Sequence, residues 1–183
     1  MCYLWRWIFV VAGALMVVLP CAVFGEAEER PSEYDVKAAY LFNFARFVEW
    51  PDDRFASAEA PIVIGILGND PFGDVLDQTV SDKLAQGRTV EVIRHVDLQQ
   101  ADSCHIVFVD ASVRDVATPL LAGYANHGVL TVGDWRGFTD DNGIIEFVIR
   151  KGRVRFRIRP DLATGGGMTI SAKLLTVGEV ASR

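Results

Sequence analysis

The sequence predicts an α/β fold, a three-layer sandwich with a mainly parallel sheet and a C-terminal antiparallel hairpin. Between residues 62 and 132, short apolar runs alternate with segments of helical spacing, which is the pattern of βαβ units with helices on both faces of a sheet. The later apolar runs 144–149 and 153–158 flank Lys151-Gly152, and so short a turn predicts a hairpin. A chain of 183 residues can bury a sizeable core, so we expect one folded domain.

The first 25 residues have the features of a secretory signal peptide. Arg6 is followed by the apolar run 7–24 and then by a charged segment, and Pro20 with the small residues after it favours cleavage. The alternative is an uncleaved membrane anchor, because about 18 apolar residues can just span a bilayer. Cys21 raises the question of lipid attachment, but Pro20 stands where that motif has a small residue. We predict a signal peptide over 1–25, a flexible leader over 26–33 and the folded domain over 34–183.

Residues 34–49 have helical spacing, with a narrow polar stripe and an apolar surface around it. So wide an apolar surface predicts packing on the sheet and also against a neighbouring helix or a second subunit. Lys37 lies outside the polar stripe, and we expect it to extend along the apolar face. Pro51 stops the helix after Trp50. The indole of Trp50 is interpreted as a core plug, with a stacking platform for a ligand as the alternative.

The following elements alternate in order. The apolar strand 62–67 precedes a glycine-rich loop, in which we expect Asp70 to cap a helix that begins at Pro71 and continues to about Leu84. The remaining expected elements are strands 89–94, 105–110 and 129–132, a helix over 113–125 and a final helix over 169–181.

Composition and motifs argue against several classes of function. The formal net charge of −6 is unlike that of a protein that coats nucleic acid. The sequence has no G-x-S-x-G elbow, and its three histidines lack the spacing of a zinc site. Cys104 and the adjacent His105 point to opposite faces of a strand, so they cannot act together. We therefore expect no catalytic residues, no metal and no cofactor, and we interpret Cys104 as an inert buried thiol without an internal disulfide, with an intermolecular bridge as the alternative.

A small-molecule site is one alternative, because ligands of open α/β sheets bind beyond the carboxyl ends of the strands. The residues that would form this ligand-binding module are Trp50, Asn69, Asp70 and Trp135. The competing interpretation is a set of capped turns.

The stretch IRKGRVRFRIRP is the most basic part of the chain. Alternation predicts that Arg153, Arg155, Arg157 and Arg159 lie on one face of a strand. If the turn has two residues, Glu146 faces Arg157 across the hairpin and can pair with it. This ribbon would suit an acidic partner or anionic lipid headgroups, whereas the alternative is a solvated face whose charges discourage edge pairing.

Several motifs together resemble the YfiR/HmsC-like family. The matching stretches are VKAAYLFNFARFVEWP at 36–51, IGILGNDPFGDVL at 64–76, CHIVFVD at 104–110, GIIEFVIRKGRVRFRI at 143–158 and ISAKLL at 170–175. The resemblance covers about residues 34–180, and its most specific part is the helix ending in E-W-P combined with the G-x-D-P-F-G turn.

The resemblance implies an exported, homodimeric α/β domain of the periplasm that has no enzymatic activity. It implies that the protein binds and represses an inner-membrane diguanylate cyclase, which lowers cyclic di-GMP and biofilm formation, and that an outer-membrane lipoprotein can sequester it. The expected contact surfaces are the helix 34–49, the final helix and the basic ribbon, with Leu174, Leu175, Arg153, Arg155 and Arg157 as candidates. For the two leucines, core packing is the alternative. The chain departs from the family pattern in the unpaired Cys104 and in the arginines at 157 and 159.

Overall fold

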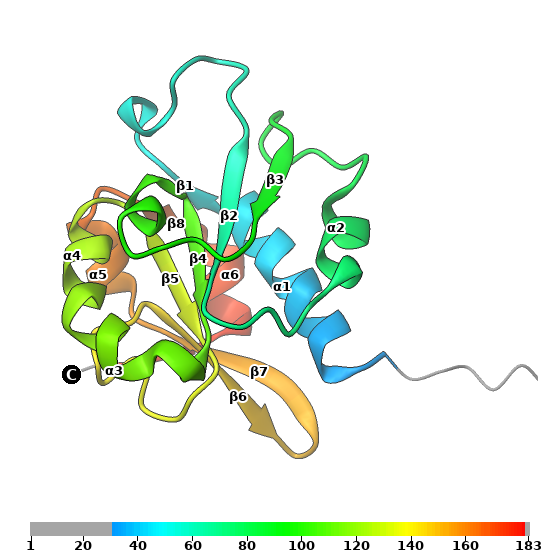
Figure 1. Cartoon of the computed structure of the whole chain (residues 1–183), viewed down its shortest axis with the longest axis vertical. Helices are drawn as coiled ribbons and strands as arrows, with labels where there is room; N and C mark the ends of the chain where they lie inside the picture. Colours follow the sequence, from blue (N-terminus) through cyan, green and yellow to red (C-terminus); the bar gives the residue numbers. More distant parts are fainter. Residues whose placement is uncertain (1–30, 182–183) are drawn as a thin grey trace, which may run out of the picture. The chain divides into compact units, whose positions relative to one another are not determined.

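The computed structural model describes residues 31–181, so the predicted signal peptide and most of the predicted leader lie outside the described residues. The main sheet has the strand order β3-β2-β4-β5-β6-β7-β9 and is parallel except for the β6–β7 hairpin (Figure 1). Its strands are β2 (Ile62–Leu67), β3 (Val90–Ile93), β4 (Ile106–Val109), β5 (Leu130–Gly133), β6 (Ile145–Arg150), β7 (Arg153–Ile158) and β9 (Glu179–Val180). The predicted α/β class and its C-terminal hairpin are confirmed.

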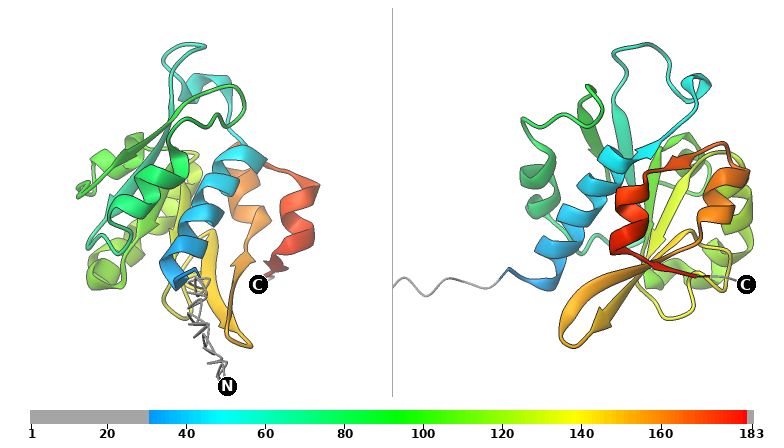
Figure 2. Two further views of the ribbon diagram at one scale, coloured as in Figure 1. Left: turned by 90° about the vertical axis from the view of Figure 1, so that its right-hand side faces the viewer. Right: turned by 180° about the vertical axis from the view of Figure 1, so that it is seen from behind.

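Helices cover both faces of this sheet and enclose two hydrophobic cores. The larger core lies under α1 (Glu33–Phe47), α2 (Asp74–Val80) and α6 (Ala172–Val177). The back view in Figure 2 shows α1 and α6 side by side in front of the sheet. The smaller core lies under α3 (Arg114–Ala117) and α4 (Leu121–Asn126), and α5 (Pro160–Gly165) packs against α4. Both cores therefore lie within the described residues.

The first helix, predicted over 34–49, begins one residue earlier at Glu33 and ends two residues earlier at Phe47. Ser32 caps it, because the Ser32 hydroxyl accepts from the Asp35 N–H at 3.2 Å while the Asp35 carboxylate accepts from the Ser32 N–H. The helix ends at Phe47 rather than at Pro51, because β1 (Val48–Glu49) pairs with β8 (Thr169–Ile170). This pairing is tertiary, so Pro51 is not what ends the helix.

Three other helix predictions were wrong in their limits. Asp70 does not cap α2; its carboxylate accepts from the Phe72 N–H at 2.8 Å and closes the turn ahead of the helix. The predicted helix 113–125 is interrupted by a 3₁₀ turn that contains Pro119, since proline has no N–H to donate. The final helix is only α6, because the extended backbone at Gly178 leads directly into β9. A side chain at 178 would collide with the Phe156 ring.

Candidate functional site

A pocket of about 480 Å³ lies between the start of α1, the loop after β5 and strand β6. At its inner end the Lys37 ammonium is 2.9 Å from the Asp134 carboxylate and 2.6 Å from that of Glu33. It also lies 4.5 Å from the centre of the Tyr34 ring. Lys37 is 3% exposed, so the expectation that it extends along the apolar face was wrong. It is a buried, paired cation that joins α1 to the loop after β5.

Burial lowers the pKa of Lys37, but hydrogen bonds to Glu33 and Asp134 outweigh it and hold that pKa above its ordinary value. The pKa of the Tyr34 hydroxyl is also raised, first by burial and then by the negative charge of Asp134. Lys37 therefore stays protonated and Tyr34 stays neutral at physiological pH. The pocket is lined by charged side chains of both signs, among them Asp134, Arg136 and Arg150.

The four residues predicted to bind a small molecule do not form one site. Trp50 lies beside His105, which precedes β4, whereas Asn69, Asp70 and Trp135 follow β2 and β5 at the other end of the strands. Asp70 is paired with Arg94 at 2.7 Å.

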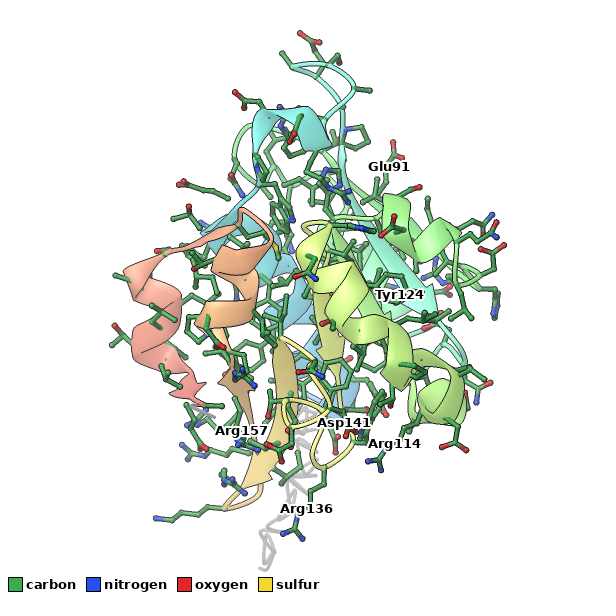
Figure 3. All side chains as sticks on the ribbon, turned by 90° about the vertical axis from the view of Figure 1, so that its left-hand side faces the viewer. Glu91, Arg114, Tyr124, Arg136, Asp141 and Arg157 are labelled. Atoms are coloured by element: carbon green, nitrogen blue, oxygen red, sulfur yellow. The ribbon has the colours of Figure 1, made fainter. Side chains whose placement is uncertain are left out.

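Trp135 is only 7% exposed, and its ring lies edge-on to Phe138 at 4.6 Å between centroids. Its indole N–H is 3.4 Å from the carboxylate of Asp141. Arg114 pairs with the same carboxylate at 3.0 Å, and Figure 3 shows these two charged residues side by side. The Trp135 indole is thus nearly buried in contacts with Phe138 and Asp141.

Trp50 lies in an aromatic cluster at the amino-terminal end of the strands. Its ring is edge-on to His105, and the Phe55 ring stacks on that imidazole with 4.5 Å between centroids. The His105 Nδ1 accepts the Val63 N–H at 3.1 Å, so the proton of the neutral ring is on Nε2. Burial, followed by the charge of Arg54, lowers the pKa of His105 to about 4. Trp50 is 7% exposed, as a core plug requires.

A smaller groove of about 260 Å³ lies between α1 and α6. The groove is lined by Tyr40, Asn43, Arg46, Phe47, Lys173, Leu174 and Val177. Leu174 is 4% exposed and belongs to the core, while Val177 is 54% exposed. Lys173 and Arg46 lie 5.0 Å and 5.3 Å from the Phe47 ring centre, and neither makes an ion pair within residues 31–181.

The arginines over residues 153–159 of the basic hairpin fall into two groups. Those at the end of β7 are paired with carboxylates, and those near the turn are not paired within the described residues. Glu146 is opposite Arg157, as predicted, and their side chains are 3.4 Å apart. Arg159 was wrongly expected on the same face: it follows the last residue of β7, is 6% exposed and pairs with Asp161 at 2.6 Å. The arginines nearer the turn, Arg153 and Arg155, have no ion-pair partner in the described part of the chain. Arg136 extends outward from the same end of the domain (Figure 3).

The described residues offer little for metal or thiol chemistry. Between residues 31 and 181, no group of three or more His, Cys, Asp or Glu residues is placed to hold a metal ion. Cys104 is 2% exposed, and burial raises the pKa of its thiol to about 11, so it is protonated and unreactive. None of the helices in this part of the chain is both long and apolar enough to cross a bilayer.

The structure thus defines an α/β domain with a charged pocket and a partly apolar groove at its surface. A family model described as YfiR/HmsC-like matches residues 34–179. The chain belongs to this family, which confirms the resemblance read from its motifs. The family consists of periplasmic, non-catalytic regulators of diguanylate cyclases. No curated protein matches the chain.

Sequence reasoning missed Asp134 as the partner of Lys37. These residues are separated by 97 positions, so no local pattern connects them. The available signal was the lysine itself, because a cation on a nearly all-apolar helix requires a carboxylate when it is buried.

Proposed function

We propose that the protein binds the periplasmic part of an inner-membrane diguanylate cyclase and represses it, thereby lowering cyclic di-GMP and biofilm formation. In this proposal the protein acts without catalysis, as a homodimer, and an outer-membrane lipoprotein can sequester it. Export by a cleaved signal peptide over 1–25 brings it to the partner. The observation that carries the proposal is the groove between α1 and α6, in a member of a family of cyclase regulators.

The groove combines an apolar floor with free cations. Phe47 and Leu174 form part of the floor, and Val177 exposes 54% of its surface beside them. Arg46 and Lys173 border the groove and lie near an aromatic ring instead of a carboxylate. An amphipathic segment that carries acidic side chains fits this surface, since charge complementarity guides the encounter and apolar contact supplies affinity.

Of the two leucines, Leu174 contributes through its position under the groove, since it is nearly buried. Leu175 is half-buried against the larger core. The basic residues Arg153 and Arg155 stand apart from this groove on the hairpin, and Arg157 is paired with Glu146. We therefore place the principal cyclase contact on α1 and α6.

The test is a pull-down of solubilised inner membranes with the segment 26–183, followed by identification of the bound proteins. We expect a membrane diguanylate cyclase to be retained, and its activity to fall when the domain is added. The variant Val177→Glu should abolish retention. Val116→Glu is the matched control, because Val116 is 56% exposed on α3, which covers the other core. Failure to retain a cyclase, or equal losses with both variants, would contradict the proposal.

A second candidate function is binding of a small molecule in the pocket near Lys37. The pocket lies beyond the carboxyl end of β5, where open α/β sheets bind ligands. A saturable change in tryptophan fluorescence that Lys37→Met abolishes would favour this function over cyclase repression.

A further inference from the structure

We propose that the tip of the β6–β7 hairpin docks on an anionic phospholipid surface. The hairpin tip is defined here as residues 149–153 together with the side chain of Arg155. This surface is separate from the α1–α6 groove, and the inference goes beyond the proposed cyclase contact. Figures 1 and 2 show that the hairpin extends past the neighbouring strands and helices at one end of the domain. The tip can therefore reach a flat surface before the rest of the domain does.

Paired and unpaired charges lie at different positions along the hairpin. Away from the turn, Arg157 contacts the buried Glu146, and Arg159 pairs with Asp161. At the turn, Arg150 stands directly opposite Arg153 in the strand register, and like charges in that position repel each other. An anionic surface in front of the tip removes this repulsion, whereas water only screens it.

Carboxylates within residues 31–181 do not neutralise the tip. Arg150 has one long contact, 3.6 Å to Glu179, and both side chains are about half exposed. Lys151, Arg153 and Arg155 make no ion pair within the described residues. The formal net charge of the protein is −6. These cations on one projection therefore make its charge distribution uneven. An anionic membrane attracts the tip and repels the rest of the surface, which orients the domain.

The tip also carries an exposed apolar side chain. Ile149 is 50% exposed, although its cross-strand partner Val154 is only 7% exposed. An isoleucine beside several cations matches the interface of a bilayer, where apolar groups enter the headgroup boundary and cations meet phosphates. Lys151 and Gly152 have φ values of 50° and 70°, which make the turn tight and the projection narrow.

The small area of the hairpin tip favours a membrane over a folded protein as its partner. A stable protein interface buries about 800 Å² on each side, which a tip of a few residues does not provide. Membrane attraction needs only several cations near the surface, each contributing about fivefold in partitioning. A periplasmic regulator of a membrane cyclase also works next to such a surface.

The experiment uses the segment 26–183, which contains both cores and excludes the apolar N-terminal run. Its co-sedimentation with phosphatidylcholine vesicles is compared with that of vesicles enriched in phosphatidylglycerol, at low and high salt. We expect binding only to the enriched vesicles and a fall with salt. The double variant Lys151→Gln/Arg153→Gln should bind about 30-fold more weakly, and Ile149→Ser should weaken binding further.

Lys83→Gln removes one charge elsewhere and, compared with Lys151→Gln alone, is the control for a general electrostatic effect. Equal losses with these two single variants, or the absence of binding to enriched vesicles, would overturn the proposal. Normal vesicle binding by the tip variant together with loss of the cyclase in the pull-down would overturn it in favour of a protein contact. If the cyclase is never retained but vesicle binding depends on the tip, the proposed function fails and this inference stands.

Discussion

The cations at the two ends of the sheet differ in their hydrogen-bond and ion-pair partners. At the amino-terminal end, Arg54 donates to the carbonyls of Asp102 and Cys104 at 3.2 Å and 2.7 Å. Arg88 donates in the same way to three carbonyls in residues 57–60. At the carboxyl end, Lys151, Arg153 and Arg155 of the hairpin tip make no ion pair within residues 31–181, and Arg150 has only a 3.6 Å contact with Glu179.

This difference distinguishes a structural end of the sheet from the end where we propose binding. Arginines that donate to backbone carbonyls hold loops in place, so their donors are not available to a partner. The aromatic cluster around Trp50 fills the remaining space at that end. Function is therefore expected beyond the carboxyl ends of the strands and on α1 and α6, and substitutions at the two ends should have different consequences.

The largest effect is expected from acid at the amino-terminal end. The pKa of His105 is about 4 in the folded protein against 6.5 for the free side chain, so the unfolded chain binds more protons between these values. Stability from neutral His105 is present above pH 6.5 and is lost as pH falls to 4, by up to about 3 kcal/mol. Urea unfolding across this range should show the loss, and His105→Asn should reduce it. An unchanged pH dependence in the variant would refute this assignment.

Lys37→Met should lower the free energy of unfolding by about 2 kcal/mol, although Lys37 lies at the carboxyl end of the strands. The substitution leaves Asp134, which is 13% exposed, without its cation. The loss is moderate because the carboxylates of Glu33 and Asp134 both keep some contact with water. The double variant Lys37→Met/Asp134→Asn should recover part of it, as measured by a double-mutant cycle. Strictly additive losses would mean that the ion pair contributes nothing.

Arg54→Met should cost about 1.5 kcal/mol of unfolding free energy, because the carbonyls of Asp102 and Cys104 lose their donor. Arg153→Met makes the same chemical change at the hairpin tip and should alter stability by less than about 0.5 kcal/mol. Denaturant midpoints of the two variants compare the ends directly. Similar losses in both would remove the distinction between a scaffold end and a binding end.

The smallest effect is expected in the turn itself. Lys151 has a φ of 50°, which asparagine accepts more readily, and Asn-Gly is the preferred pair for such a turn. Lys151→Asn should therefore stabilise the domain by about 0.5 kcal/mol while it weakens vesicle binding. A decrease in melting temperature would show that Lys151 has a structural contact.

The sequence predicted the elements whose causes are local. The apolar run Ile62–Leu67 is a buried strand, and Lys151-Gly152 correctly set the register that places Glu146 opposite Arg157. Distant partners were not predictable: Val48 leaves the helix to pair with Ile170. The partner of Lys37 is equally remote, and Arg159 donates to the carbonyl of Thr139, which is 20 positions away. The proposed binding surfaces depend on such distant contacts, so their composition was only partly visible.

Cys104 has a practical consequence for studying this domain. It is the only cysteine after residue 25, and its sulfur lies so close to Gly65 that any side chain there would displace it. An alkylating reagent can reach a protonated thiol that is 2% exposed only when the sheet opens around it. The rate at which Cys104 is alkylated in native buffer, followed by mass, therefore reports the spontaneous unfolding of the domain around it.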